Sequence, residues 1–457
     1  MMTTPRYAPP TPPIRRTDPG LRGFLRAARS NVLGLWPDQA YEQDVYATRF
    51  LGRTTLLLNA PDAIRRVLVD NPGNYRRSPA SIRILRPLTG DGLLLSEGAA
   101  WRLQRRTIAP ALGPRMLPLL ARHVVAVVDE TVAALRSVAG GPVDLLAAMQ
   151  GMALEIAGRS MFSVETSGAA PALRAMVQEY GADLARAHLA DLLLPVALPT
   201  FRDLRRRWFR RRWMAVMSGL IRDRLGQPPP AAPRDLFDLL RAARDPETGA
   251  GFGAQALRDQ TATMILAGHE TTAVTLFWAL SLLAAAPEEQ ALLAAEVRGL
   301  DLTAAVAAGT IPELPRTRAV VAETLRLYPP AFTMARAAIG PDDACCISIP
   351  SGTLILIAPW VLHRHRRFWG EPAVFDPDRF APGAPPPPRF AYLPFGAGPR
   401  MCVGAQFALT EAALGLAALV RAFEITRADD RPVLPVAIVT TQPDHAPGFR
   451  LRARTDG

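Results

Sequence analysis

The sequence contains no lysine, so arginine supplies all of its positive side-chain charge at neutral pH. There are 53 basic residues against 41 acidic ones, which gives a formal net charge of +12. Abundant alanine and proline accompany the arginine, as a bias towards GC-rich codons would produce, and we find no basic tail or nucleic-acid motif. The charge therefore does not indicate nucleic-acid binding. A basic face for an acidic protein partner and a set of scattered, solvated arginines both stay open.

Cysteine is also scarce, with only Cys345, Cys346 and Cys402 in 457 residues. Two of the three are adjacent, so they provide no disulfide framework, and the sequence favours a reducing, cytoplasmic compartment. Residues 1–40 form a proline- and arginine-rich arm whose start lacks an apolar core. This arm predicts neither a signal peptide nor a membrane anchor. With 49% hydrophobic residues, the chain can still bury a large core.

The longest apolar run, residues 264–286, is about long enough to cross a membrane but carries His269 and Glu270 near its start. Ionisable side chains are costly inside a bilayer. The run therefore predicts a buried central helix over residues 259–286 rather than a membrane span.

Three residues inside this helix suggest a ligand site. Gly268 costs about 1 kcal/mol relative to alanine in a helix interior, and a flat ligand against the backbone would explain it. Thr271 can bond back to a preceding carbonyl and loosen the helix, while Glu270 supplies an acid. The alternative is a helix-packing glycine with incidental polar neighbours. A zinc site of the His-Glu-x-x-His type is excluded because Ala273 holds the second histidine position.

A glycine-rich loop, Phe395 to Gly404, precedes an apolar helical pattern and contains the third cysteine. Cys402 lies where this loop meets the helix N-terminus, and Arg400 precedes it by two residues. Unpaired N–H groups, the helix dipole and a nearby cation favour thiolate over thiol, and a thiolate is a good iron ligand. A small buried hydrophobe is the alternative. Met401 excludes a dinucleotide fingerprint, and no histidine is placed by sequence as the base of a cysteine nucleophile.

The loop resembles the haem-binding loop of the cytochrome P450 family, Phe-x-x-Gly-x-Arg-x-Cys-x-Gly, at every fixed position. The resemblance implies that Cys402 is the axial thiolate ligand of haem iron and that Arg400 contacts a haem propionate. Phe395 belongs to the same cofactor-binding loop.

Residues 267–272 likewise resemble the family motif Ala-Gly-x-Glu-Thr-Thr. The resemblance implies that Gly268 lies against haem and that Glu270 and Thr271 are the acid–alcohol pair that delivers protons for O–O cleavage. Such cleavage needs an ordered proton path rather than bulk water.

Other arginines have a place in the same family pattern. Trp101 and Arg105 are four residues apart and share a helix face, which alone indicates a surface arginine packed on an aromatic ring. They also match the family's Trp-x-x-x-Arg pattern, which implies that both approach a propionate. Arg336 lies where the family often places a further propionate-binding arginine.

Glu323 and Arg326 lie at i and i+3 and match the family's Glu-x-x-Arg signature. Alone, such a pair is usually an exposed salt bridge. The stretch 375–380 matches the segment whose arginine, here Arg379, joins that pair. The resemblance implies a buried structural network behind the haem.

Taken over nearly the whole chain, the resemblance implies one mainly helical domain, residues 1–457, with a smaller β region. Haem b would lie between the central helix and the helix after Cys402. The implied reaction inserts one atom of O2 into an apolar substrate such as a fatty acid, terpenoid or aromatic compound. Electrons would come from a separate ferredoxin and its NAD(P)H-dependent reductase. Residues 76–95 and 170–205 would line the pocket.

Two other functions stay open. One is a haem-thiolate peroxygenase that uses H2O2, against which the pair Glu270 and Thr271 argues. The other is a non-enzymatic binder of haem or hydrophobic ligands, which would have no use for that pair.

The arginine- and tryptophan-rich stretch 205–213 suggests contact with a membrane surface. We favour instead a solvated helix face with a few aromatic core contacts. Elsewhere, residues 44–59 predict a hairpin around Gly52, and residues 61–69 a helix with Asn59 as its cap. Residues 335–357 read as strands of a small sheet.

Overall fold

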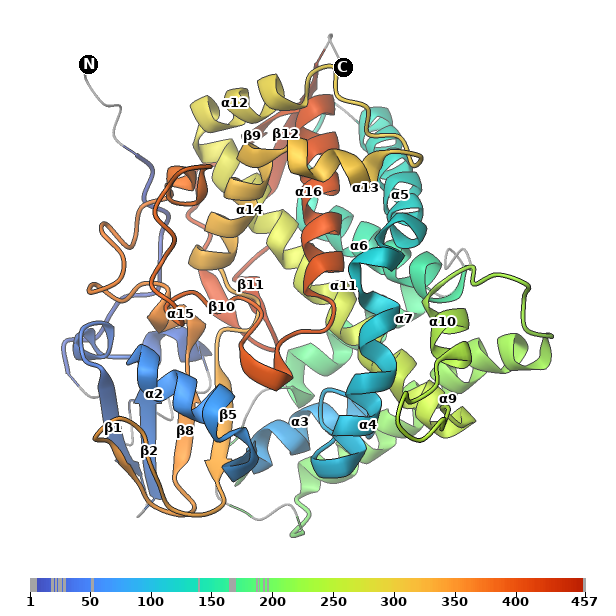
Figure 1. The fold of residues 1–457 in the computed structure, drawn as a ribbon. Helices are drawn as coiled ribbons and strands as arrows, with labels where there is room; N and C mark the ends of the chain where they lie inside the picture. Colours follow the sequence, from blue (N-terminus) through green and yellow to red (C-terminus); the bar gives the residue numbers. More distant parts are fainter. Residues whose placement is uncertain are drawn as a thin grey trace.

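The computed structural model describes residues 6–454 apart from 18–19, 21–22, 24–26, 28–29, 51–52, 139, 164–169, 186–187, 189, 192–193 and 195–196. Most of these residues are helical (Figure 1). The α-helices are α2 (Pro61–Arg65), α3 (Pro79–Thr89), α4 (Gly98–Ile108), α5 (Leu117–Ser137), α6 (Leu145–Phe162), α7 (Ala170–Glu179), α9 (Phe201–Gly226), α10 (Leu236–Ala242), α11 (Ala254–Ala285), α12 (Pro287–Val297), α13 (Ala307–Thr310), α14 (Pro315–Leu327), α15 (Pro359–Leu362) and α16 (Ala405–Ala422).

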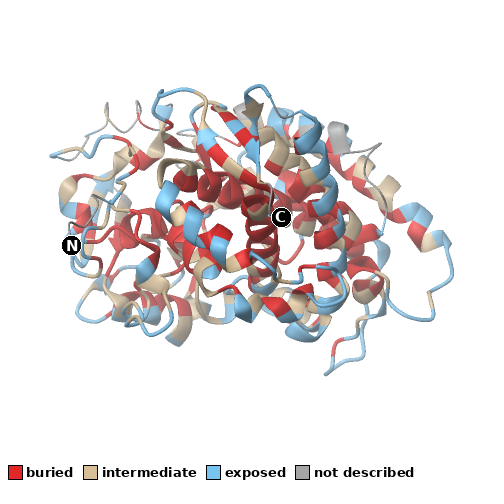
Figure 2. Cartoon of the chain, turned by 90° about the horizontal axis from the view of Figure 1, so that it is seen from above, coloured by how far each residue is buried: buried red, intermediate tan, exposed pale blue. Residues whose placement is uncertain are grey.

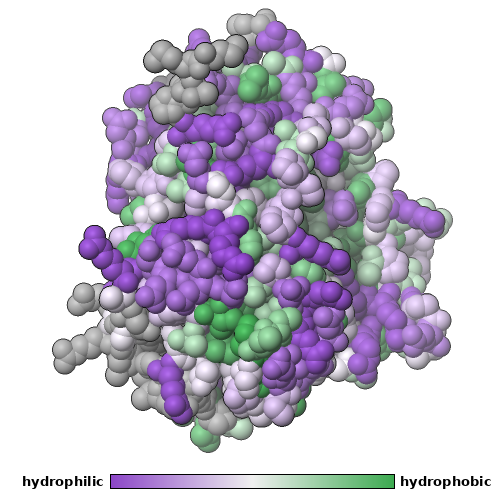
Figure 3. Space-filling view, turned by 60° about the vertical axis from the view of Figure 1, so that its left-hand side comes forward, coloured by the Kyte–Doolittle hydropathy of each residue, from purple (hydrophilic) through white to green (hydrophobic). Residues whose placement is uncertain are grey.

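The main sheet lies to one side of the helices, at the lower left of Figure 1. Its strand order is β1 (Val45–Phe50), β2 (Arg53–Leu58), β8 (Leu354–Ile357), β5 (Met334–Ala338) and β3 (Tyr75–Arg77), with only β2 and β8 parallel. On the face that this region presents, hydrophilic side chains predominate, with small hydrophobic areas between them (Figure 3).

The other strands form three further small sheets within the described residues. Their members are β4 (Val143–Asp144), β12 (Gly448–Ala453) and β9 (Phe423–Arg427); β6 (Asp342–Asp343) and β7 (Ser348–Ile349); and β10 (Pro435–Ala437) and β11 (Thr441–Pro443). The mainly helical fold with a smaller β region, expected from the sequence, is confirmed.

Helices α11 and α16 form the centre of the molecule, where the buried residues gather (Figure 2). The two helices approach closely at Gly415, where an added Cβ would lie 3.4 Å from the side chain of Leu276. On length and composition α16 could cross a membrane, but 72% of it is buried inside the protein. The long apolar run of the sequence is the buried part of α11, as expected.

Local expectations for the N-terminal half had mixed outcomes. Strands β1 and β2 form the expected hairpin, although its turn at Gly52 lies outside the described residues. The expected cap by Asn59 is wrong, because its side-chain amide donates to the carbonyls of Ala40 and Gln43, both at 2.9 Å. These tertiary partners hold Asn59 away from α2, whose N-cap residue is Ala60.

Candidate active site

The loop that carries Cys402 is held in place by its own backbone. Gly396 and Gly398 have φ angles of +72° and +71°, a region that favours glycine. A Cβ on Gly398 would lie 2.0 Å from the carbonyl oxygen of Leu68, so no other residue fits there. The Cys402 N–H donates to the carbonyl of Phe395 at 2.9 Å, which closes the loop just before α16 begins.

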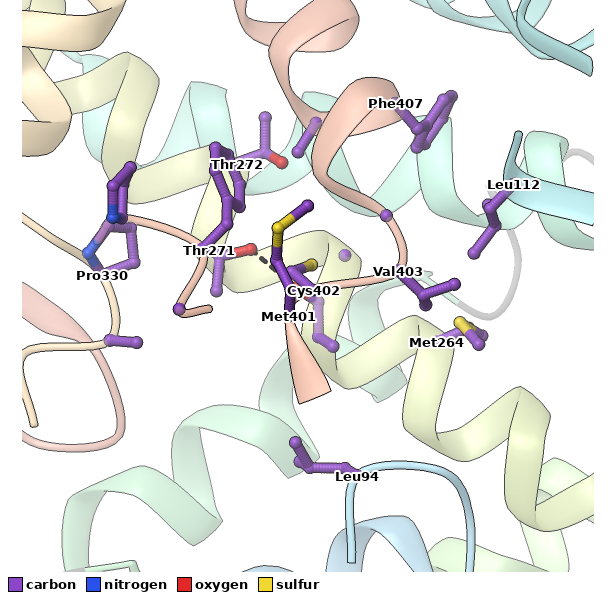
Figure 4. A pocket seen from close by; sticks show the side chains of 18 of the residues that line it. Leu94, Leu112, Met264, Thr271, Thr272, Pro330, Met401, Cys402, Val403 and Phe407 are labelled. Carbon is purple, nitrogen blue, oxygen red and sulfur yellow. Dashed lines mark hydrogen bonds between the residues drawn. The ribbon is translucent and has the colours of Figure 1, made fainter. Parts of the chain in front are cut away.

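A cavity of about 360 Å³ separates this loop from α11. Cys402 and Thr271 both face it, while Leu94 and Met264 form other parts of its wall (Figure 4). Further apolar side chains line the wall, among them Leu93, Ala267, Pro330 and Met334.

The electrostatics of Cys402 differ from the sequence expectation. The accessible surface of this residue opens into the cavity, and the surrounding protein raises the pKa of the thiol through desolvation. The Gly404 N–H and the guanidinium of Arg105 lower the pKa, but burial outweighs them. The sequence predicted a lowered pKa for Cys402, and this direction is wrong because burial raises the pKa. The cation that stabilises the thiolate is Arg105 rather than Arg400. Without a positive ligand, the protein favours the neutral thiol.

Helix α11 presents a bare stretch of backbone to the cavity at Gly268. Apart from its chain neighbours and the backbone of its own helix, an added Cβ there would meet no atom of the described residues within 4 Å, although Gly268 lines the cavity wall. The Thr271 hydroxyl, three residues on, donates to the carbonyl of Ala267 at 2.6 Å, as predicted. A flat ligand could therefore lie against this helix without steric conflict.

Glu270 does not line the cavity but faces the β10–β11 hairpin. Its carboxylate accepts hydrogen bonds from Gln442 Nε2 at 2.5 Å and from Thr440 Oγ1 at 3.3 Å. Burial raises the pKa of Glu270, and these two bonds oppose the rise. The structure thus places the two members of the predicted acid–alcohol pair on different sides of α11.

Two arginines face each other at the edge of the cavity. Arg77 of β3 and Arg336 of β5 are direct partners in an antiparallel pair, an arrangement that is unfavourable for like charges. Burial, together with repulsion from Arg336 and Arg400, lowers the pKa of Arg77 to about 9. Burial and repulsion from Arg400 lower the pKa of Arg336 to about 10. Arg77 Nε has no hydrogen-bond partner among the described residues.

The remaining predicted cofactor contacts lie around the same edge. The Arg400 guanidinium stacks over the ring of Trp101 at 4.5 Å, so Trp101 pairs with Arg400 and not with Arg105. Arg400 also forms an ion pair with Glu97. Arg105 donates to the carbonyl of Met401 at 2.7 Å, and burial lowers its pKa. Trp101, Arg105 and Arg400 all line the cavity.

These features fit the haem that the sequence resemblance implies. A thiol at one wall, an open glycine backbone at the other and apolar surroundings match a flat, iron-bearing macrocycle. Four arginines lie at this edge, and within the described part of the chain only one carboxylate, Glu97, forms an ion pair with any of them. The excess of positive charge suits an anionic group such as two propionates.

The predicted Glu323 network lies in the core, away from the cavity. Arg326 donates to both carboxylate oxygens of Glu323 at 2.7 Å, and both side chains are fully buried. Arg379 contributes less, because its Nε lies 3.7 Å from Glu323 and 3.8 Å from Asp376.

Sequence reasoning missed several polar residues of the cavity wall, including Glu411 and Ser160. Glu411 of α16 is 2% exposed, and its Oε2 lies 3.4 Å from Thr272 Oγ1. Its Oε1 and the Ser160 hydroxyl have no hydrogen-bond partner among the described residues. Burial raises the pKa of Glu411 to about 8, so the carboxyl is largely protonated at neutral pH. An acid within an apolar helical run, the signal used for Glu270, would have singled out Glu411.

The expected pocket segments are present only in part. Arg77, Leu93 and Leu94 line the cavity, but no described residue of 170–205 does, and several of that range lie outside the described residues. Within this range α7 packs on α6, and Tyr180 reaches α3, where it donates to the carbonyl of Ile84 at 2.5 Å.

Comparisons with known proteins agree with this site. The family model described as Cytochrome P450 matches residues 38–445. The chain is 33% identical to cyclooctat-9-en-7-ol 5-monooxygenase of Streptomyces melanosporofaciens, over 79% of this chain and 77% of that protein. It is 30% identical to pentalenene oxygenase of Streptomyces avermitilis, over 87% of each chain.

The fold has equally extensive matches among solved structures. The crystal structure of the cytochrome P450DA heme domain superposes with a TM-score of 0.77 and covers 99% of this chain and 98% of its own, at 24% identity. The family-model match spans the cysteine loop, the central helix and the arginines of the cavity edge. The chain therefore belongs to the cytochrome P450 family and is a P450 monooxygenase, an oxidoreductase.

Proposed function

We propose that this monooxygenase inserts one atom of O2 into an apolar terpenoid, with the other atom leaving as water. The names of two relatives, cyclooctat-9-en-7-ol 5-monooxygenase and pentalenene oxygenase, support this substrate class. The single observation that carries the activity is Cys402 facing Gly268 and Thr271 across one apolar cavity.

The cavity walls support an apolar substrate. Leu93, Leu94 and Met264 offer hydrocarbon surface near Thr271, and burying apolar substrate surface there is worth about 25 cal/mol per Å². Such a surface holds a ring hydrocarbon through shape rather than through directional bonds. It also excludes bulk water from the reacting atoms.

Haem b, held by the Cys402 thiolate, would supply the O2 chemistry, and its positive iron would offset the desolvation that raises the thiol pKa. Thr271 would hold a proton at the cavity through its hydroxyl. Because that hydroxyl donates to the carbonyl of Ala267, its oxygen would accept a hydrogen bond from a water molecule on the path. Glu270, whose pKa is raised by burial, would resupply the path from the far side of α11.

Arg77, Arg336, Arg105 and Arg400 would bind the two propionates, with Trp101 packed against Arg400. As the family resemblance implies, electrons would come from a separate ferredoxin and its NAD(P)H-dependent reductase. Arg326 and Glu323 would have a structural role only.

The first experiment records the absorption spectrum of the reduced protein with carbon monoxide, with Cys402→Ala and Cys345→Ala in parallel. We expect a strongly red-shifted Soret band in the unchanged protein and in Cys345→Ala, and its loss in Cys402→Ala. A histidine-type spectrum, or a band that survives in Cys402→Ala, would refute the ligand assignment. Cyclic terpenes should then shift the ferric Soret band more than fatty acids do.

A further inference from the structure

Helix α9 carries a stripe of large apolar side chains that face solvent. Phe201, Leu204 and Trp208 are 76%, 54% and 58% exposed, and Leu198, just before the helix, is 55% exposed. Three of these four follow the spacing i, i+3, i+7 and therefore lie along one face of the helix. Single exposed apolar residues are ordinary, but a continuous stripe of them marks an interaction surface.

Exposed arginines border this stripe on both sides. At about 100° per residue, Arg207 and Arg211 lie along one edge of the stripe and Arg205 and Arg212 along the other. The guanidinium of Arg212 lies 4.5 Å from the centre of the Trp208 ring.

The opposite face of α9 is firmly anchored in the protein. Phe209 and Trp213 are fully buried, and Trp213 donates to the carbonyl of Leu88 at 2.7 Å. A capping box between Thr200 and Asp203 fixes the first turn. The expected aromatic core contacts are therefore present, but the solvated face is not simply polar. The stripe is displayed on a rigid helix.

The charge around the stripe is strongly positive. Arg205 and Arg212 have acidic partners on neighbouring elements. Arg207 and Arg211 have no carboxylate partner among the described residues, so their charges are available to a partner outside the protein.

We propose that the first turns of α9 dock on the surface of an anionic lipid bilayer. Phe201, Leu204 and Trp208 would enter the interface, while the flanking arginines reach outward to lipid phosphates. A second copy of the chain fits less well, because arginines on both edges of the stripe would repel their own copies. An acidic protein would pair with the arginines but would not account for three exposed apolar side chains.

The docking surface is tied to the cavity by one buried arginine. Arg83 of α3 binds Asp203 at 2.9 Å and the carbonyl of Leu198 at 2.8 Å, and α3 leads directly to Leu93 and Leu94 of the cavity wall. Docking would therefore hold this end of the cavity close to lipid. If the proposed apolar substrate is right, which the docking itself does not require, the bilayer is where that substrate concentrates.

The test is co-sedimentation of the full-length, haem-loaded protein with vesicles of phosphatidylcholine alone or mixed with phosphatidylglycerol. We expect binding to the anionic vesicles that weakens as salt is raised. The double variant Leu204→Ser with Trp208→Ser should lose about tenfold or more of this binding, because it removes two apolar anchors. Arg207→Gln with Arg211→Gln should abolish the preference for anionic lipid.

Leu292→Ser provides the matched control, because Leu292 is a 53% exposed leucine on α12. It should bind vesicles like the unchanged protein, and circular dichroism should show that every variant is folded. Absence of vesicle binding, or binding that the α9 variants leave unchanged, would overturn the proposal. Concentration-dependent self-association lost in the α9 variants, without vesicle binding, would instead assign the stripe to a second copy. None of these results depends on the substrate or on the carbon monoxide spectrum.

Discussion

Two groups of buried arginines in this protein have opposite surroundings. Arg326 uses all five of its N–H groups, bonding both oxygens of Glu323 and the carbonyls of His363, Pro372 and Val374. Arg336, which is 6% exposed, has only the carbonyl of its neighbour Ala335 as side-chain acceptor among the described residues, and it faces Arg77 across the sheet.

This difference distinguishes an arginine that stabilises the fold from arginines that bind a ligand. A buried ion pair whose hydrogen bonds are all made supports the fold from within. Buried arginines that repel each other cost stability unless an anion arrives, so their position makes sense only with a bound group. Position relative to the cavity agrees, since Arg336 and Arg77 line it and Arg326 does not.

The largest expected effect is on the paired group. Arg326→Leu should lower the free energy of unfolding by about 3–5 kcal/mol, because it leaves Glu323 buried without a cation. Urea denaturation of the protein and of Arg318→Leu, an exposed arginine on the same helix, measures the difference. If both variants lose the same small amount, the pair does not support the fold.

Glu411 extends the comparison to a buried acid with no cationic partner in the part of the chain that the structure describes. Its pKa of about 8 lies above the ordinary carboxyl value, so the folded protein binds a proton more tightly than the unfolded chain does. The free energy of unfolding should therefore fall by about 3 kcal/mol as the pH rises from about 6 to about 9. Glu411→Gln should remove this slope in urea denaturation, whereas the exposed Glu313→Gln should keep it. An unchanged slope in Glu411→Gln would contradict the assignment.

Substitution of an arginine at the cavity edge should affect stability differently from substitution of Arg326. Arg336→Gln should not destabilise the haem-free protein, because it relieves repulsion with Arg77. It should weaken haem binding by about tenfold or more, as expected for a lost charged hydrogen bond worth about 1.5–3 kcal/mol. Haem transfer to an excess of an acceptor protein measures the loss, with the exposed neighbour Arg76→Gln as control. Equal transfer rates in the two variants would assign Arg336 to the fold.

The sequence predicts an interaction best when its members lie close together along the chain. The Cys402 loop is contiguous, and Glu323 and Arg326 are one helical turn apart, so short motifs were enough to pair them. The partnership of Arg77 with Arg336 depends on the register of two strands about 260 residues apart, which no local pattern contains. The direction of the pKa shift of Cys402 likewise depends on how deeply the thiol is buried, which the local sequence does not contain.

The smallest effect should come from Arg379, although the sequence grouped it with the buried pair. Its contacts with Glu323 and Asp376 are long, 3.7 and 3.8 Å, and its firmest bond is to the carbonyl of Glu371 at 3.1 Å. Burial and repulsion from Arg326 lower the pKa of Arg379, so its charge adds little to a pair that is already complete. Arg379→Gln should therefore cost less than about 1 kcal/mol of unfolding free energy in urea. A loss as large as that of Arg326→Leu would mean that Glu323 needs both arginines.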